Sequence, residues 1–498
     1  MELQQALQQL DLLQRKQIAY GHAMGLISYD GNTVAPKGSA ANRAETLGIL
    51  SGEIYKLSTS EETIALLDEL HARREELDLK SRRIVEVMHK EIENTRKIPM
   101  DEYIAYQKLC VEAEDIWRKA KDANDYPLFM PYLKELIEYT RRIAHYTHPD
   151  LPVYDALLDQ YEKGLTREKC DQFFDTLRRE LVPLIHKVAQ AKQVDDSFLT
   201  GVFPLDKQHQ LSNYVMQVMG IDRNHCGIGE TEHPFTTGFT KYDVRITTHY
   251  YENNFASSLY SVIHEGGHAL YDLHPADDLA YTNIGGGVSM SIHESQSRFY
   301  ENIIGRSRAF VSLIAPKLRE LFPEINDRTD DELYKAFNKA QPSLIRTESD
   351  ELHYCMHIMV RYELEQKLMD GTLTVEALPQ EWNRLYKEYL SVDVPSDREG
   401  VLQDTHWAGG MFGYFPSYAL GSAYGAQMLS IMQETVDVQS VIESGDLTPI
   451  NCWLEEHIWK YGGLYEPGTL LETALGRPFD PMYFVQYLKQ KFTEIYQL

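Results

Sequence analysis

The sequence predicts a mainly α-helical protein, and three observations lead to this expectation. Apolar residues recur at spacings of three and four along most of the 498 residues, as on the buried face of an amphipathic helix. Strict alternation of polar and apolar residues, which is typical of a strand, is confined to one short segment. No Pro-, Gly- or Ser-rich linker interrupts the chain, so we expect one large domain spanning residues 1–498.

Residues 1–200 are expected to form a mainly helical scaffold. Amphipathic patterns in this half cover Glu61–Leu77, Leu79–Thr95, Met100–Ala120 and Tyr126–Tyr146. Short proline-containing turns separate several of these patterns, as expected where a helix has to end. The motifs that carry chemistry lie later, and we expect the catalytic core in residues 230–425.

A small antiparallel β element is expected before residue 250. Residues Asp243–Tyr250 alternate polar with apolar and are rich in β-branched side chains, which predicts a strand. The preceding segment TTGFTK can supply its partner strand and the turn.

Two later helices matter for the site. Asn253-Asn254 offers an N-cap for a helix from Phe255 to about Leu273, which stops before Pro275. A second long helix is expected from about Ser343 to Met369, ending at Gly371.

Composition excludes several function classes. The formal net charge of −26 and the isoelectric point near 5.1 repel nucleic acid and anionic membranes, so we expect neither as a partner. The N-terminus lacks the basic start and apolar run of a secretory signal, and nowhere do 18 apolar residues follow one another. The five cysteines are scattered without CxxC spacing, as in a reducing compartment. We therefore expect a cytoplasmic protein.

The segment HEGGH at His264–His268 predicts a metal site on the first of these helices. His264 and His268 lie one turn apart on one face, so both imidazoles can reach a single ion. Glu265 is rotated by about 100°, where it can take a proton from water activated at the metal. Gly266 and Gly267 each cost about 1 kcal/mol in a helix interior, which indicates close approach of substrate or another backbone. The alternative is a chance match on a buried helix.

A zinc peptidase needs a third protein ligand, and Glu294 is the candidate. The residues after His268 lack the extended HExxHxxGxxH pattern, which leaves a glutamate on a later helix. Glu294 follows in SIHESQSRFYEN, at a distance that suits a helix, turn, helix arrangement. Ser291-x-x-Glu294 also fits a capping box, which is the alternative. His293 either packs or supports a ligand, and Asp272 can accept a hydrogen bond from a ligand imidazole.

Six ordered motifs resemble those of one family, the thermostable (Taq-type) metallocarboxypeptidases. They are HPF at His233–Phe235, DVRIT at Asp243–Thr247, HEGGH at His264–His268, HESQ at His293–Gln296, IRTESD at Ile345–Asp350 and GVLQDTHW at Gly400–Trp407. Six motifs in the family's order are much more specific than HExxH alone.

The resemblance implies both a fold and an activity. It implies a large helical domain with a deep central groove and the β element beside the metal site, similar to oligopeptidases and angiotensin-converting enzymes. It also implies one Zn²⁺ or Co²⁺ per chain, and release of single residues from peptide C-termini with broad specificity. The partners it implies are peptide substrates and a second copy of the chain in a homodimer.

The resemblance also suggests residues that recognise the substrate. Arg346 in IRTESD is the first candidate to hold the substrate carboxylate by two hydrogen bonds, and Arg245 on the strand is the second. The alternative for Arg346 is an ion pair with Asp350 on its own helix. His233 is expected either to line the groove or to support another residue of the site.

Further residues are candidates for stabilising the tetrahedral intermediate. His406 and Tyr418, in the segment HWAGGMFGYFPSYALG, are assigned this role because related oligopeptidases place a His and a Tyr in a similar segment. Tyr414 is the alternate, and packing of an aromatic loop is the competing explanation. Gln403 and Asp404 receive no role from sequence.

Two other functions remain open at this point. A metallo-oligoendopeptidase would use the same metal and base and differ only in recognising the chain end. A non-catalytic helical protein with a structural metal would need a closed four-ligand site, whereas only three ligands are evident.

Overall fold

The computed structural model describes all 498 residues and contains twenty α-helices and one three-stranded sheet. The chain divides into two compact units, each assembled from three chain segments. Unit 1 comprises Met1–Glu93, Asp195–Phe337 and Met428–Phe479, and unit 2 comprises Asn94–Val194, Asn338–Gln427 and Asp480–Leu498. None of the helices combines the length and the apolar character that crossing a membrane would require.

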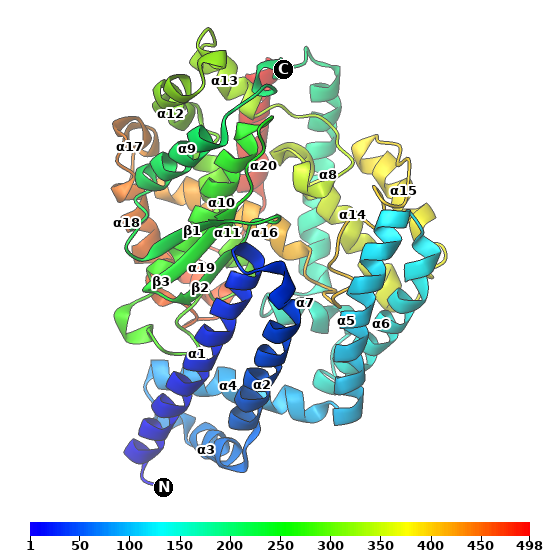
Figure 1. Cartoon of the computed structure of the whole chain (residues 1–498), viewed down its shortest axis with the longest axis vertical. Helices are drawn as coiled ribbons and strands as arrows, with labels where there is room; N and C mark the ends of the chain where they lie inside the picture. Colours follow the sequence, from blue (N-terminus) through cyan, green and yellow to red (C-terminus); the bar gives the residue numbers. More distant parts are fainter. The chain divides into compact units, whose positions relative to one another are not determined.

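Unit 1 contains the sheet and most of the helices around it (Figure 1). Its helices are α1 (Leu3–Thr33), α2 (Ala40–Thr59), α3 (Glu61–Ala72), α4 (Leu79–Lys97), α9 (Leu205–Val218), α10 (Phe255–Leu273), α11 (Met290–Arg298), α12 (Arg308–Leu321), α13 (Asp330–Phe337), α17 (Val438–Ser444), α18 (Thr448–His457) and α19 (Pro467–Leu475). A single π-helical segment, Phe299–Ile304, directly continues α11.

The sheet has the order β1-β3-β2 and is mixed. Strands β2 (Thr236–Thr240) and β3 (Asp243–Thr248) pair antiparallel, which confirms the predicted element, with Thr236 opposite Ile246. Strand β1 (Cys226–Glu230) pairs parallel to β3 and was missed by the sequence, since its residues CGIGE are rich in glycine and carry little strand signal. The predicted β element is therefore correct in position but is mixed rather than purely antiparallel.

Helix α10 lies at the centre of unit 1. It packs against β2 and β3 on one side and against α9 and α11 elsewhere, and Figure 1 shows it beside the sheet. Its apolar residues, such as Leu259, Val262 and Leu270, are almost completely buried. A second apolar cluster joins α1, α3 and α4 at the N-terminal end of the chain.

Unit 2 is almost entirely helical. Its helices are α5 (Met100–Ala123), α6 (Tyr126–Thr147), α7 (Val153–Tyr161), α8 (Arg167–Gln190), α14 (Glu351–Asp370), α15 (Leu378–Leu390) and α20 (Met482–Tyr496), while α16 (Pro416–Met432) begins in unit 2 and ends in unit 1. Helix α14 packs against α6, α7, α8 and α15, so side chains on all of its faces are buried.

The predicted helices agree with the structure except at one important boundary. Four patterns in the N-terminal half correspond to α3, α4, α5 and α6, and the helix from Phe255 to Leu273 is α10 itself. The helix expected from Ser343 begins only at Glu351, because Asp350 caps it through bonds from the backbone N–H groups of Leu352 and His353. Its end at Gly371, which has φ +75°, is as predicted.

Candidate active site

Helices α10 and α11 approach unusually closely, and a glycine makes this possible. A Cβ atom at Gly267 would lie 2.6 Å from the carbonyl oxygen of Gln296 and 2.7 Å from the Cα atom of Ser297, both in α11. The backbone of α11 therefore occupies the space that a side chain would need. This confirms the predicted close backbone for Gly267 and brings Glu294 over the histidines. Gly266 instead faces side chains, since a Cβ there would lie 2.8 Å from Met219 Cε and 3.0 Å from Ile221 Cδ1.

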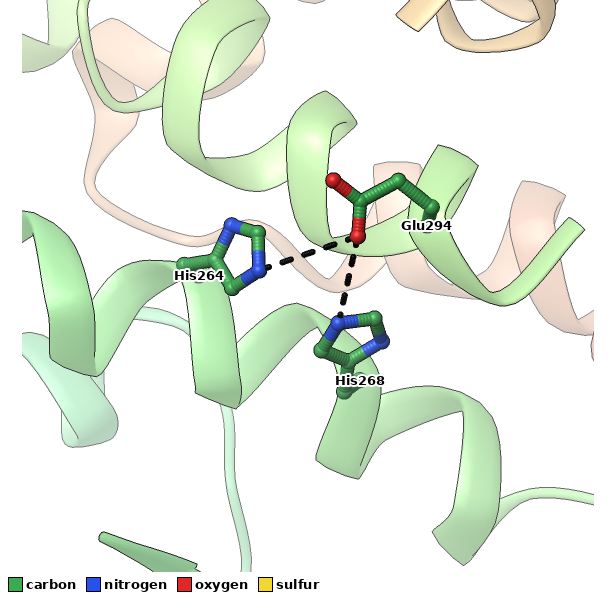
Figure 2. Close-up of side chains that lie close together, drawn as sticks. All are labelled: His264, His268 and Glu294. Atoms are coloured by element: carbon green, nitrogen blue, oxygen red, sulfur yellow. Dashed lines mark ion pairs between the residues drawn. The ribbon is translucent and has the colours of Figure 1, made fainter. Parts of the chain in front are cut away.

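His264, His268 and Glu294 converge, as Figure 2 shows. The distance from Glu294 Oε2 is 3.8 Å to His264 Nε2 and 3.6 Å to His268 Nε2. Ligand atoms held at 2.0–2.1 Å from one tetrahedral ion lie about 3.3 Å apart, so the three atoms have nearly the spacing of ligands that share a metal. Glu294 does not cap its helix: the N-cap is Ser289, whose hydroxyl accepts from the Ile292 N–H, and the capping-box alternative is wrong.

Both histidines use Nδ1 for a supporting contact, which leaves Nε2 facing Glu294. His264 Nδ1 lies 2.9 Å from Glu301 Oε2. His268 Nδ1 lies 2.7 Å from His293 Nδ1, and His293 Nε2 lies 3.0 Å from Asp272 Oδ1. A histidine that ligates through Nε2 carries its proton on Nδ1; in that state His268 donates to His293 and His293 donates to Asp272. Asp272 thus reaches His268 through His293 and not directly.

Two arginines compensate the carboxylates of this cluster. Arg298 donates to Glu294 Oε1 at 2.7 Å and to Glu301 Oε2 at 3.2 Å, and Arg306 contacts the other oxygen of Glu301 at 3.3 Å. Burial raises the pKa of Glu294, but Arg298 and the ligand histidines outweigh burial and hold this pKa far below its usual value. The same balance lowers the pKa of Glu301 to about 2. Both groups are therefore carboxylates, the form that binds a cation.

Glu265 is bonded to strand β2. The Thr236 hydroxyl lies 2.6 Å from Glu265 Oε2 and 3.0 Å from its carbonyl oxygen. Glu265 is buried, with 7% exposure. One of its carboxylate oxygens is thus fixed by the strand.

The donor set of this cluster suits a divalent ion. Two imidazole nitrogens and one carboxylate oxygen are the three protein ligands of many catalytic zinc sites, in which the fourth position stays open. The supporting carboxylate and histidine contacts fix the tautomers that such a site needs. The residues present therefore fit a metal.

Unit 2 contains a second buried cluster, centred on Asp404. Arg346 Nη2 lies 2.9 Å from Asp404 Oδ1, and Arg361 Nη2 lies 2.6 Å from Asp404 Oδ2. Arg346 is only 6% exposed and Arg361 is fully buried. Burial raises the pKa of Asp404, but the two guanidinium groups outweigh it and hold this pKa far below its usual value. The single negative charge of Asp404 thus lies between two permanent positive charges.

Arg346 lies in a 3-10 turn before α14, so the alternative of an ion pair with Asp350 on its own helix is wrong. Gln403 holds the backbone of this turn, since its Oε1 atom accepts from the Arg346 N–H at 3.0 Å. The guanidinium also donates through Nη1 to the Tyr354 hydroxyl oxygen at 3.1 Å and lies 5.0 Å from the ring centroid of Tyr418. Gln403 and Asp404, which had no role from sequence, both orient Arg346.

His406 and Tyr418 lie together at this cluster. His406 Nε2 is 3.1 Å from the Tyr418 hydroxyl. Burial lowers the pKa of His406 to about 4, so the imidazole is neutral at neutral pH and one ring nitrogen can donate. Tyr414 is a neighbour of both, with ring centroids 5.6 Å from His406 and 5.0 Å from Tyr418.

Two residues predicted to bind substrate, Arg245 and His233, lie in unit 1 and belong to neither of these clusters. Arg245 alternates with the buried Val244 and Ile246 of β3, and it pairs with Asp243 at 2.9 Å and stacks on Tyr29 of α1. Since successive side chains of a strand face opposite sides, Arg245 points away from α10. His233 is exposed in the connection between β1 and β2.

Several supporting residues were missed by the sequence reading. Glu301 and Arg298 follow Glu294 at seven and four residues, so helical spacing could have identified them. Thr236 and Arg361 become visible only through contacts between distant segments, and no local pattern signals them.

Comparison with known proteins identifies the family. The model of the Carboxypeptidase Taq (M32) metallopeptidase family matches residues 9–492. The chain is 41% identical over 491 residues to Carboxypeptidase 1 of Bacillus subtilis, covering 98% of each chain, and 35% identical to Thermostable carboxypeptidase 1 of Pyrococcus furiosus, covering 95% of this chain and 96% of that protein. The crystal structure of the M32 carboxypeptidase from Deinococcus radiodurans superposes with a TM-score of 0.96 at 32% identity, over 99% of this chain and 100% of that one. As its ordered motifs predict, the chain belongs to the Carboxypeptidase Taq (M32) metallopeptidase family and is a metal-dependent carboxypeptidase.

Proposed function

We propose that this protein releases single residues with broad specificity from the C-termini of peptides, using one divalent ion bound by His264, His268 and Glu294. The observation that carries this proposal is the convergence of three ligand atoms, all within 4.8 Å of one another, beside a buried carboxylate that is not a ligand. When bound, such an ion supplies Lewis acidity and activates water as a nucleophile at neutral pH. The chain's own residues perform the remaining steps.

Glu265 acts as the general base. It lies next to the ligand His264, and Thr236 fixes its carboxylate through Oε2. In this role it takes a proton from the attacking water and later delivers it to the nitrogen of the leaving amino acid. Thr236 prevents rotation of the carboxylate between these two transfers.

Arg346 binds the free carboxylate of the substrate, with Arg245 as the second candidate. The bonded group of Arg346, Arg361 and Asp404 carries two positive charges and one negative charge. A buried net charge of one sign favours a ligand of the opposite sign. A substrate carboxylate supplies the missing charge, and planar Arg346 can bind it with two hydrogen bonds.

His406 and Tyr418 stabilise the tetrahedral intermediate. A neutral His406 bonded to the Tyr418 hydroxyl at 3.1 Å provides donors that can be aimed at the developing negative charge. His233, exposed near β2, belongs to the substrate groove in this proposal.

The finer properties of the protein are also proposals. A histidine-rich ligand set favours Zn²⁺, with Co²⁺ as the substitute. Five free cysteines support a cytoplasmic location. The family resemblance supports a homodimer, and a family match that runs through both units supports treating residues 1–498 as one catalytic domain.

The decisive experiment uses one peptide in three forms: free acid, C-terminally amidated, and N-terminally blocked. The purified protein is incubated with each form, with and without a chelator, and products are identified by mass. We expect single residues to leave the free acid and the N-blocked peptide stepwise, and cleavage of the amide to be much slower. Internal fragments would identify an oligoendopeptidase, and unchanged cleavage in chelator would refute the metal mechanism.

A further inference from the structure

The segment Asp404–Tyr418, here called the 404–418 loop, carries three of the groups assigned above. Asp404 orients Arg346, while His406 and Tyr418 form the hydrogen-bonded pair. From Ser391 to Phe415 the chain forms only turns and irregular structure, whereas Tyr418 lies in the first turn of α16. Regular hydrogen bonding therefore does not hold Asp404 and His406 in place, and other contacts must do so.

A single buried carboxylate on α14 contacts this loop at two points. Glu365 is fully buried, and its Oε1 atom accepts from the indole N–H of Trp407 at 2.7 Å. Its Oε2 atom accepts from the backbone N–H of Gly413 at 2.9 Å and from the Tyr154 hydroxyl at 2.8 Å. The two loop residues that Glu365 contacts, Trp407 and Gly413, both lie between His406 and Tyr418 in the sequence.

A carboxyl group satisfies this arrangement, either ionised or with its proton directed at the Tyr154 hydroxyl oxygen. The indole and backbone N–H groups can donate but not accept, so the loop requires an acceptor at each oxygen. A glutamine would offer one oxygen and would direct its NH₂ group at a donor. The position that donates to Glu365 Oε2 also requires a glycine, because Gly413 has φ +85° and a Cβ there would lie 2.9 Å from the backbone of Leu157.

Helix α5 contacts the loop and the residues just before it. The Tyr106 hydroxyl donates to the carbonyl of Gly410 in the loop at 3.3 Å, and the Trp117 indole donates to the carbonyl of Leu402, before the loop, at 3.0 Å. Helix α5 thus reaches the loop at Gly410, whereas Glu365 links α14 to both Trp407 and Gly413. Arg361, four residues before Glu365, is the charged group that α14 places nearest to it.

We propose that Glu365 is a positioning residue that fixes the 404–418 loop, and through it the His406–Tyr418 pair, in the geometry needed for turnover. The proposal rests on the roles proposed for His406 and Tyr418. Because it concerns transition-state groups, loss of Glu365 affects kcat more than KM.

The first measurement reports on the loop without using activity. Hydrogen exchange is compared between the wild type and Glu365→Gln, with Glu363→Gln as the matched control. Glu363 is a carboxylate of the same helix that accepts from a tyrosine, Tyr389, at 2.7 Å and does not contact the loop. We expect faster exchange across residues 404–418 in Glu365→Gln only. Unchanged exchange there would overturn the proposal even if the proposed activity were absent.

The second measurement is kinetic and uses the metal-loaded protein. We expect Glu365→Gln to lower kcat by about 10- to 100-fold, as a small misplacement of catalytic groups does, with KM changing less than about threefold. Trp407→Phe, which removes one loop contact, should likewise lower kcat with little change in KM. Tyr154→Phe, which leaves both loop contacts in place, should not. Equal losses of kcat in Glu365→Gln and Glu363→Gln would show a merely structural role and contradict the proposal. An inactive wild type would instead refute the proposed function, and the exchange result would still stand.

Discussion

The ligand cluster of unit 1 and the arginine cluster of unit 2 are opposite in charge. In unit 1 four carboxylates face two arginines, which leaves a formal charge of −2; the groups are Glu265, Glu294, Glu301 and Asp272 with Arg298 and Arg306. In unit 2 Arg346 and Arg361 share Asp404, which leaves +1. Since uncompensated buried charge is costly, the first cluster favours a divalent cation and the second a single carboxylate.

The two clusters also differ in construction. The candidate ligands of unit 1 lie on two regular helices, so their positions follow from helical spacing and from the close approach at Gly267. The charged groups of the unit 2 cluster come from a 3-10 turn, from α14 and from an irregular loop. Substitutions in the first cluster should therefore remove chemistry or metal, and those in the second should alter recognition and turnover.

The largest effect is expected from Glu265→Gln, which separates chemistry from metal binding within the first cluster. The amide keeps an oxygen for Thr236 but cannot take a proton, so kcat should fall by about 100- to 10,000-fold. Elemental analysis should still find one ion per chain. Near-normal turnover by the variant with metal bound would exclude Glu265 as the base.

A second test compares the two arginine candidates. Arg346→Lys keeps the charge and loses the planar pair of donors, so we expect kcat/KM on a free-acid peptide to fall by about 100-fold. Cleavage of the amidated peptide, which lacks the carboxylate, should change little. Arg245→Lys is measured in parallel, and loss of the acid-over-amide preference in that variant would transfer the role to Arg245.

The contrast between the clusters also explains what the sequence could predict. His264 and His268 share a face because of their spacing, and Gly267 indicated a neighbouring backbone that proves to be α11. Strand β1 was missed because its residues CGIGE carry little strand signal of their own, and only the pairing with β3 defines the strand. Local periodicity can thus be read from the sequence, whereas pairing between separate segments cannot.

The start of α14 is a second feature that local sequence patterns did not predict. Residues 343–350 continue the helical pattern, but the side chain of Asp350 caps the helix and leaves Arg346 in a separate turn. As a result Arg346 pairs with Asp404, 58 residues away, and not with Asp350. Glu365 and Arg361 lie on a helix buried on all faces, so no amphipathic pattern distinguishes them from packing residues.

Glu301→Gln tests whether the support of a ligand matters as much as the ligand. Glu301 contacts His264 directly at 2.9 Å, whereas Asp272 acts on His268 through His293. We expect Glu301→Gln to weaken metal affinity by about 10- to 100-fold and Asp272→Asn to weaken it less. Competition with a chelator of known affinity measures both, and the reverse order would contradict the assigned contacts.

The smallest effect concerns the pH dependence of stability. Burial raises the pKa of Glu365 from 4.5 to about 7, so between these values the folded protein binds a proton that the unfolded chain does not. Stability from this group is therefore present at low pH and is lost as pH rises toward 7. Glu365→Gln cannot titrate, and metal-ligand effects cancel when the two proteins are compared. The melting temperature of the wild type, measured relative to the variant by calorimetry, should fall by roughly 1–3 °C between pH 5 and pH 8. Parallel curves would show that the charge of Glu365 is compensated in the fold, and that the carboxylate holds the loop in its ionised form throughout this range.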